Sequence, residues 1–294
     1  MNKPLVSICI PTFNGGKYLK EALDSVLKQE YKNCEIIFSD DSSQDDTLKI
    51  IKDFKNKNNI SVQLLHHKPR GIGANWNNCI KYANGEYIKF LFQDDVLFPD
   101  CISKLVKTIQ ENNSIGLVAC KRQLILEQPR SREIKDWIDN YFDLQQDLKE
   151  ISGKFLLTRS LFKENIFFKD PVNKIGEPST VLFKKKLIKK VGLFREDLEQ
   201  VLDYEFYFRI LKYENIVILN EELVGFRLHK HQTTNVNRER EIADYAAFDR
   251  ILYDDFFWHL SYVEQKRLLF KFNAPYRKYR RLLYFIKNHF NSII

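Results

Sequence analysis

The sequence predicts an α/β fold in which a mostly parallel, Rossmann-like sheet is flanked by helices. Leu5–Ile10 is a β-branched apolar run closed by Pro11, and Lys17–Gln29 follows with apolar residues at helical spacing. The same alternation of strand and helix then repeats, which is typical of a parallel sheet. With 294 residues, 44% of them hydrophobic, the chain is long enough to bury a substantial core.

The later elements follow in chain order. Near the N-terminus, strands are expected at Glu35–Phe38, Val62–Leu65 and Tyr87–Phe92, and helices at Thr47–Phe54 and Gly73–Ala83. Farther along, the pattern predicts strands at Gly116–Arg122, Ser179–Phe183 and Ile216–Leu219, and helices at Ile134–Leu148 and Lys184–Val191. A further helix follows Leu198, and Asp203 lies near its start. No function is assigned to residues 123–172.

Polar and acidic side chains follow the first four predicted strands. Ligands of parallel sheets bind at the carboxyl ends of the strands, so these loops are expected to line one edge. They are Pro11–Asn14, Asp40–Ser43, Pro69–Gly73 and Asp94–Asp95. Each loop alone is equally consistent with an ordinary turn. Taken together, with Arg70 as their cationic member, the four loops indicate a site for a nucleotide with a bound metal.

Asp94 and Asp95 are adjacent carboxylates with no Lys or Arg beside them in the sequence. Two such charges repel, so either one carboxyl group takes up a proton or a cation lies between them. Oxygen ligands of this kind suit Mg²⁺ or Mn²⁺. A solvated turn before Pro99 is the alternative. Because the chain has neither GxGxxG nor GxxxxGK[ST], a phosphate group bound here would need the metal.

Composition limits the class of protein. The five cysteines have no CxxC pair, which predicts ordinary thiols rather than disulfides or a zinc site. The N-terminal apolar run is too short for a signal peptide, and no segment approaches the roughly 18 apolar residues that span a bilayer. We therefore expect a cytoplasmic or peripheral protein. The net charge of +8 is concentrated partly in residues 276–294, which hold five Lys or Arg and no acid.

Five ordered blocks of sequence point to a known family. The segment PTFNGGKYLKEALDSVLKQEYKNCEIIFSDDSSQDDT resembles the opening of the family 2 glycosyltransferases, which carry a GT-A fold. The later blocks are RGIGANWNNCIKYANGEYIKFLFQDD, GEPSTVLFKKKLIKKVGLF, LDYEFYFRI and FRLHKHQ. The resemblance covers Lys3 to Thr234. It predicts a GT-A domain over residues 1–234, with nucleotide-sugar binding in 1–118 and the acceptor or catalytic part in 119–234, and a basic helical extension over 235–294.

The resemblance implies an inverting transfer of a sugar from a nucleotide-diphosphate donor, most simply a UDP-sugar. Pro11, Thr12 and Asn14 match the loop along the nucleoside, and Asp40 matches the acid that accepts a hydrogen bond from the base, with Asp41 the weaker candidate. Arg70 and Asn75 match the region that approaches the base and phosphates. Many relatives have Arg at the position of Trp76, so the local contacts differ here.

For the metal, Asp95 matches the acid that binds Mn²⁺ or Mg²⁺, and Asp94 the acid that meets the ribose or the metal's ligands. His229 matches a histidine that reaches the metal or diphosphate. Arg227 is expected to help hold the leaving diphosphate. The common form of the motif has an acid two positions before Asp94, and this chain has Phe92 instead.

Asp203 matches the general base that removes the proton of the acceptor hydroxyl. A plain helix cap is its structural alternative. Glu205 is the nearby competitor, although it faces another direction along the helix. Glu177 lies where relatives meet the acceptor, and we count Glu177 and Glu205 as acceptor-site candidates.

The C-terminal stretch predicts a basic amphipathic helix. Its apolar face would comprise Tyr279, Leu282, Leu283, Ile286 and Phe290. Such a helix can lie on an anionic membrane, or its apolar face can pack on the catalytic domain. Membrane contact would suit a lipid-linked glycan acceptor in bacterial surface polysaccharide or lipopolysaccharide synthesis.

Two other functions fit parts of the sequence. A nucleotidyltransferase shares the α/β layout and the metal, but it would need a Gly-rich loop with Arg or Lys after the first strand, and PTFNGG has neither cation. A nucleic-acid-binding module would suit the positive charge. The acidic edge that includes Asp40, Asp41, Asp94 and Asp95 would repel a phosphate backbone, so we predict no nucleic-acid partner.

Overall fold

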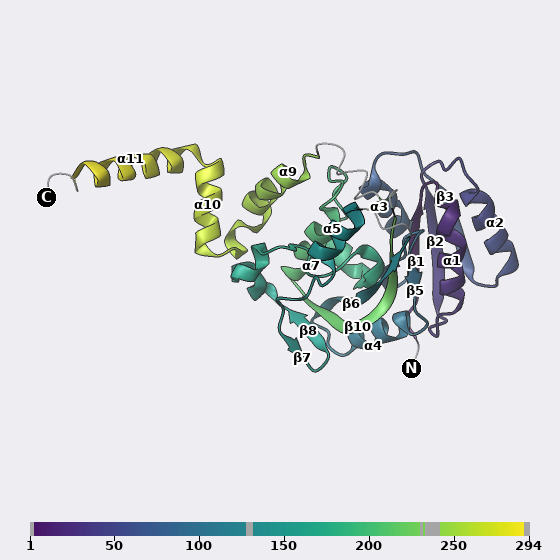
Figure 1. The fold of residues 1–294 in the computed structure, drawn as a ribbon. Coiled ribbons are helices and arrows are strands. Elements are labelled where there is room, and N and C mark those ends of the chain that lie inside the picture. The colour runs from purple at the N-terminus through teal and green to yellow at the C-terminus, as the bar shows by residue number, and fades with distance from the viewer. Residues whose placement is uncertain (1–2, 128–131, 230–231, 233–241, 291–294) are drawn as a thin grey trace. The chain divides into compact units, whose positions relative to one another are not determined.

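The computed structural model describes residues 3–127, 132–229, 232 and 242–290; at residue 133 and residues 285–290 it describes the backbone alone. The chain divides into two compact units (Figure 1). The first comprises Met1–Arg159 and Asp170–Ile242, and the second Ser160–Lys169 and Ala243–Ile294. The domain boundary expected at residue 234 lies outside the described residues.

The first unit is built on one mixed sheet. Among the described residues the sheet has ten strands in the order β3-β2-β1-β4-β9-β6-β10-β8-β7, with β5 paired to β10. The strands are β1 (Val6–Thr12), β2 (Cys34–Asp40), β3 (Ser61–His66), β4 (Tyr87–Phe90), β5 (Val96–Leu97), β6 (Ile115–Leu126), β7 (Glu150–Ile151), β8 (Lys154–Leu157), β9 (Val181–Lys184) and β10 (Asn215–Leu228). The first four strands are parallel, whereas β9 runs antiparallel between β4 and β6.

Helices cover both faces of this sheet. They are α1 (Gly16–Leu27), α2 (Thr47–Lys57), α3 (Ile72–Tyr82), α4 (Cys101–Gln110), α5 (Arg132–Tyr141), α6 (Ile188–Val191) and α7 (Leu202–Leu211). Val6, Ile8 and Ile10 of β1 share a buried cluster with residues of α1, α2 and α4. Alternate side chains of a strand point to opposite faces, so β2 also has a second face. On that face Cys79 of α3 lies 3.6 Å from the carbonyl of Ile37.

The predicted α/β class is confirmed, and strands and helices alternate as expected from Val6 to Phe90. One difference concerns β10, which runs for 14 residues where the sequence predicted a strand only at Ile216–Leu219. Polar residues after Leu219 interrupt the apolar pattern, and the register with β6 shifts at this point. A bulge lets the strand bend and continue through these residues. The strand therefore includes Arg227 near its end and is followed directly by His229.

Two predicted helices are shorter than expected. The segment Ile134–Leu148 forms α5 only as far as Tyr141, whose carbonyl accepts a hydrogen bond from Arg122 at 2.5 Å. In Lys184–Val191 the first residue ends strand β9, a 3-10 turn follows at Lys185–Leu187, and only α6 is α-helical.

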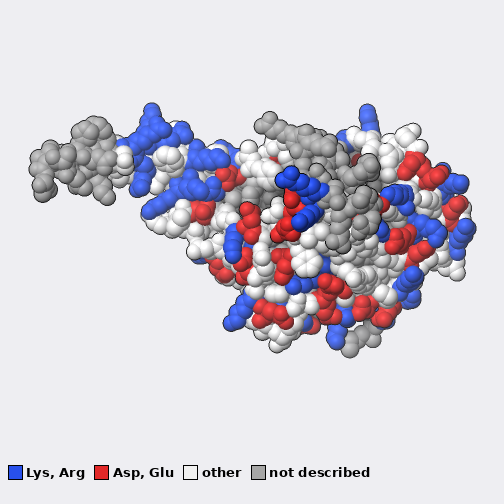
Figure 2. Space-filling view, in the orientation of Figure 1, with Lys and Arg blue, Asp and Glu red and all other residues white. Residues whose placement is uncertain are grey.

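The second unit consists of helices. It contains the 3-10 turns Arg159–Lys163, of which Arg159 belongs to the first unit, and Asn165–Phe168, α9 (Asp244–Ile251), a π-helical turn at Leu252–Phe256, a 3-10 turn at Phe257–His259, α10 (Tyr262–Phe272) and α11 (Ala274–Phe290). Phe162 packs against Phe167 and Phe256, with ring centroids 5.1 and 5.6 Å away. Lys and Arg side chains are prominent on the C-terminal helix (Figure 2). Within the described part of the chain, none of the helices has both the length and the apolar character needed to cross a bilayer.

Candidate active site

A cleft of about 500 Å³ in the first unit lies where the first strands end. All four loops expected at this edge contribute to it, with Thr12, Asp41, Gly71 and Asp94 among the lining residues. The strands β1, β2 and β4 are parallel neighbours, so their carboxyl ends meet here. Other lining residues come from the segment before β9, including Glu177, and from the first turn of α7, including Asp203.

The predicted site residues divide between the lining of this cleft and the structure behind it. Those that line it are Pro11, Thr12, Asn75, Asp94, Glu177, Asp203 and His229. Those that lie elsewhere are Asn14, Asp40, Arg70, Asp95, Glu205 and Arg227. Lining residues that sequence reasoning did not select include Phe13, Gln93, Glu199, Phe226 and Gln232.

Asp40 and Asp41 have different environments. Asp40 is fully buried and accepts hydrogen bonds from the hydroxyls of Thr12 (2.8 Å) and Ser43 (2.6 Å) and from the Ser43 N–H (2.9 Å). Asp41 lines the cleft and pairs with Nδ1 of His67. Burial raises the pKa of Asp41 and the His67 contact opposes that rise. Asp40 therefore holds the loops together, and Asp41 is the acid that the cleft presents to a ligand.

Three donor-site candidates have distinct positions. Asn14, with a φ of 49°, accepts a hydrogen bond from the Gln44 N–H at 2.8 Å and so joins two loops. Arg70 lines a neighbouring cleft of about 690 Å³ and lies 4.0 Å from Glu196. Asn75 lines the main cleft, and its buried Oδ1 has no hydrogen-bond partner among the described residues. Of the three, Asn75 is the one positioned to contact a ligand in the main cleft.

Asp94 lies at the edge of the cleft, and Asp95 lies just behind it. Asp95 is 1% exposed, and its Oδ1 accepts a hydrogen bond from the Arg227 N–H at 3.1 Å. Its Oδ2 is buried without a well-aligned hydrogen bond from any described residue. Burial, together with the charge of Asp94, raises the pKa of Asp95 well above its usual range, although the nearby Ser179 hydroxyl opposes this. Within the described part of the chain, the negative charge of an ionised Asp95 is therefore not balanced by a nearby positive charge.

His229 and Arg227 approach the same loop from the end of β10. Nε2 of His229 lies 2.9 Å from Oδ2 of Asp94, and the histidine lines the cleft. Arg227 turns away from the cleft: its Nε donates to the Asp94 carbonyl at 3.0 Å, and its Nη2 binds Glu21 at 2.5 Å. In this arrangement Arg227 supports the Asp94–Asp95 loop from behind.

The two positions at which this chain departs from the common family pattern are in contact. The rings of Trp76 and Phe92 have centroids 5.1 Å apart, and both residues line the cleft. Trp76 also packs edge-on against Phe194. Two aromatic side chains thus form a continuous apolar surface at the two positions where the family resemblance implied charged residues.

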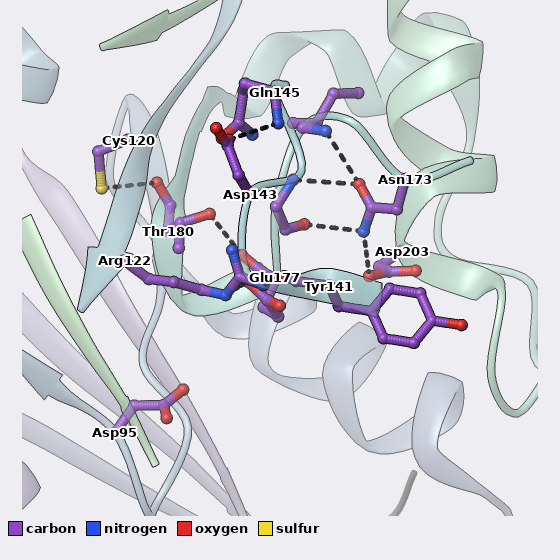
Figure 3. A network of polar contacts seen from close by, with 12 residues as sticks. Asp95, Cys120, Arg122, Tyr141, Asp143, Gln145, Asn173, Glu177, Thr180 and Asp203 are labelled. Atoms are coloured by element: carbon purple, nitrogen blue, oxygen red, sulfur yellow. Dashed lines mark hydrogen bonds and ion pairs between the residues drawn. The ribbon is translucent and has the colours of Figure 1, made fainter. Parts of the chain in front are cut away.

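Asp203 and Glu177 form a second pair of acids in the cleft (Figure 3). Asp203, in the first turn of α7, accepts hydrogen bonds from the Tyr204 N–H at 2.7 Å and from Nδ2 of Asn173 at 3.2 Å. Burial, together with the charge of Glu177, raises the pKa of Asp203 to about 7. Glu177 lies 3.0 Å from Nε of the buried Arg122, and burial raises its pKa against the effect of that arginine.

Glu205, the competitor of Asp203, is fully buried in the first turn of α7. Its two oxygens bind Arg209 at 2.9 and 3.0 Å in a bidentate pair. Because Glu205 is absent from the lining of the cleft, its carboxylate serves the packing of the helix.

An acidic cleft at the carboxyl edge of a mostly parallel sheet is the arrangement of a GT-A glycosyltransferase domain. The family described as glycosyl transferase family 2 matches residues 7–192. A relative from Rickettsia typhi, named an uncharacterized glycosyltransferase, is 32% identical over 79% of this chain. The match spans 66% of that relative, just under two thirds of its length. This chain therefore belongs to glycosyl transferase family 2.

Solved structures share the fold. TarS of S. aureus, in complex with UDP-GlcNAc, aligns with a TM-score of 0.65 and 21% identity over 91% of this chain and 71% of that chain. Mannosyltransferase PcManGT of Pyrobaculum calidifontis, in complex with GDP-Man and Mn²⁺, aligns with a TM-score of 0.58 and 16% identity over 95% and 84%. The predicted GT-A fold is confirmed. The family membership favours glycosyl transfer over the nucleotidyltransferase and nucleic-acid-binding alternatives.

Proposed function

We propose that this protein is an inverting glycosyltransferase that moves a sugar from a UDP-sugar to a hydroxyl of a glycan or lipid-linked glycan. The pathway we propose is the synthesis of bacterial surface polysaccharide or lipopolysaccharide. The main support is that Asp94, after a nucleotide-side strand, and Asp203, at the start of α7, line the same cleft. Asp203 is an acid whose pKa of about 7 suits proton transfer.

The donor would lie along the wall that the strand-end loops form. Pro11 and Thr12 line it, Asp41 offers a carboxylate to the imide N–H of uracil, and Asn75 has a free amide oxygen beside them. UDP-GlcNAc and GDP-Man are bound by structural neighbours of this fold. These neighbours support a nucleotide-diphosphate sugar as the donor class.

The acids fit a divalent cation that is shared with the donor. No group of three or more His, Cys, Asp or Glu side chains among the described residues forms a complete metal cage. Mg²⁺ is commonly held by one or two carboxylates plus substrate phosphates. Asp94 and the unpartnered Oδ2 of Asp95, with His229 beside them, offer such a partial set. When bound, Mn²⁺ or Mg²⁺ would neutralise charge on the diphosphate.

Asp203 would serve as the general base. The acceptor oxygen forms a bond to the anomeric carbon while the bond from that carbon to the diphosphate breaks. The diphosphate leaves with the electron pair, and the hydroxyl proton passes to the Asp203 carboxylate. Attack from the opposite side inverts the anomeric configuration. Glu177, beside Asp203, would contact the acceptor.

A first experiment is a thermal-shift panel of UDP-, GDP-, CMP- and dTDP-sugars, each with Mn²⁺ and with EDTA. A ligand that binds the native state raises Tm, and saturation at about 100 times Kd adds roughly 2.7 kcal/mol. We expect a rise with one UDP-sugar only when Mn²⁺ is present. Asp95→Asn, which keeps an acceptor for the Arg227 N–H, should lose the Mn²⁺-dependent part of the rise. Equal shifts with Mn²⁺ and with EDTA in the unmodified chain would refute the metal role.

The second unit would bring the enzyme to an anionic membrane. On the predicted apolar face of α11, Tyr279 and Leu282 are more than half exposed, and residues 276–294 carry five Lys or Arg and no acid. The side chains of Ile286 and Phe290, expected on the same face, lie outside the described residues. Each basic side chain near an anionic surface contributes about 1 kcal/mol.

Vesicle co-sedimentation tests this proposal. Changing Arg277, Lys278, Arg280 and Arg281 to Gln should abolish binding to vesicles with anionic lipid. Changing Lys49, Lys52, Lys55 and Lys57 of α2 to Gln is the control of equal charge and should leave binding intact. Equal loss in both variants would mean that net charge alone attracts the protein to the vesicles.

A further inference from the structure

The amide of Asn173 connects the proposed base to the turn that carries Glu177. Its Nδ2 lies 3.2 Å from Oδ2 of Asp203 and 3.1 Å from the carbonyl of Gly176. Its Oδ1 accepts hydrogen bonds from the N–H groups of Ile175 and Gly176, both at 3.0 Å. Figure 3 shows the amide between this turn and Asp203.

The orientation of this amide is determined by the backbone. Two N–H groups face one end of the amide, so the acceptor oxygen must lie there and the NH₂ group must face Asp203. Gly176 has a φ of 133°, and a Cβ at this position would lie 2.4 Å from the Thr180 hydroxyl. Few other residues can therefore form the turn, and the Nδ2 donor is held in place before any ligand arrives.

Nδ2 of Asn173 faces the Asp203 carboxylate, whose negative charge has little other compensation. Among the described residues, Asp203 accepts one other hydrogen bond, from the Tyr204 N–H. In the same part of the chain, the titratable groups that interact with it are Glu177, ion-paired with Arg122, and the buried Tyr207. None of these brings a positive charge directly to Asp203. A hydrogen bond to the ionised form offsets part of the cost of burying it.

We propose that Asn173 is a positioning residue for the general base: it fixes the orientation of the Asp203 carboxylate and favours its ionised form. The catalytic part of this inference rests on the proposed function. The structural part, a charge-dependent coupling between Asn173 and Asp203, does not.

The first test is a double-mutant cycle in thermal unfolding of the full chain, without ligand. At about pH 8.5 Asp203 is ionised in the native state, so Asp203→Asn should raise Tm. In an Asn173→Ala background that rise should be larger by about 3 °C, because the ionised carboxylate has lost its donor. At about pH 5, where Asp203 is protonated, the two backgrounds should give the same change.

Gln145→Ala is the matched control. Gln145 donates to the Lys174 carbonyl at 2.8 Å in the same network but makes no contact with Asp203. In a Gln145→Ala background, Asp203→Asn should therefore change Tm by the same amount as in the unmodified chain. If Asn173→Ala does not fold, Asn173→Ser keeps an acceptor for the turn and is too short to reach Asp203. If Asp203→Asn changed Tm by the same amount in the Asn173→Ala background as in the unmodified background at the higher pH, the proposal would be overturned.

The second test uses release of UDP from UDP-GlcNAc with Mn²⁺ as the probe reaction. Asn173→Ala should move the acid limb of the pH–rate profile upward by roughly one pH unit, whereas Gln145→Ala should not move it. An unchanged limb in the Asn173 variant would refute the catalytic part. If the unmodified chain released no UDP from any donor, the proposed function would fail, while the Tm cycle would still decide the coupling.

Discussion

The cleft contains two pairs of acids whose charges are compensated in different ways. Among the described residues, Asp94 and Asp95 form no ion pair with Lys or Arg, and one oxygen of Asp95 has no partner. Glu177 has Arg122 at 3.0 Å, and Asp203 has Asn173. The first pair thus has the imidazole of His229, 2.9 Å from Asp94, beside it, whereas the second pair has Arg122 and Asn173. This difference fits a donor site completed by a cation and an acceptor site that must work without one.

The largest effect is expected at Asp203. Asp203→Asn should lower the transfer rate by about 10²- to 10⁴-fold, because the base can no longer accept a proton. Donor affinity should stay within twofold by titration, since we propose that the donor binds along the strand-end loops rather than at Asp203. Glu205→Gln is the control within α7. Full activity in Asp203→Asn would show that the two acid pairs do not differ in role.

Removing Arg122, the positive charge that pairs with Glu177, should destabilise the protein. Arg122→Met leaves the buried Glu177 without its partner, which costs roughly 3 kcal/mol near neutral pH. Burial already raises the pKa of Glu177, so the folded state without Arg122 binds a proton more strongly than the unfolded chain. The missing stability should therefore return as pH falls through that raised pKa, and urea unfolding at several pH values would measure it.

Two further variants sharpen this measurement. Adding Glu177→Gln to Arg122→Met should recover most of the lost stability near neutral pH. Lys121→Met removes the cation of a neighbouring, more exposed pair with Asp143 at 3.5 Å, and should cost less than about 1 kcal/mol. A double variant as unstable as Arg122→Met alone would assign the cost to the packing of Arg122 on Trp137 and Phe226.

The pH dependence of the transfer rate should follow the protonation of Asp203. With a pKa of about 7, Asp203 is increasingly protonated at lower pH, so the rate should fall about tenfold per unit well below that value. Native stability should change in the opposite sense. The folded pKa lies above the unfolded one, so stability from this group is fully present below about pH 4 and is lost as pH rises through about 7. Asp203→Asn should remove both dependences.

Local sequence pattern was sufficient for the wall of the cleft that the strand-end loops form. Thr12 and Asp94 follow apolar strands, and parallel strands bring their carboxyl ends to one edge. That wall could therefore be placed from periodicity and turn residues alone. Family resemblance was needed for Asp203, because one acid near the start of a helix is indistinguishable from a cap.

Contacts between distant segments could not be predicted. The pairing of Arg122 with Glu177 joins residues 55 positions apart, on either side of a region to which the sequence assigned no function. The direction of Arg227 depends on Glu21, far earlier in the chain. The contrast between Asp40 and Asp41 has the same origin, since successive residues at a strand end face opposite sides and only the fold decides which side is the cleft.

The smallest predicted effect distinguishes the role of Asp41 from that of Asp40. Asp41→Asn should weaken binding of the UDP-sugar by about tenfold, as expected for one lost hydrogen bond to a charged group. Asp40→Asn should instead lower stability by about 1 to 2 kcal/mol, because three hydrogen bonds from Thr12 and Ser43 converge on its carboxylate. Calorimetric titration and urea unfolding of both variants would measure the two quantities. If Asp40→Asn lost affinity at unchanged stability, Asp40 would contact the donor directly and the loop 40–43 would rearrange when the ligand binds.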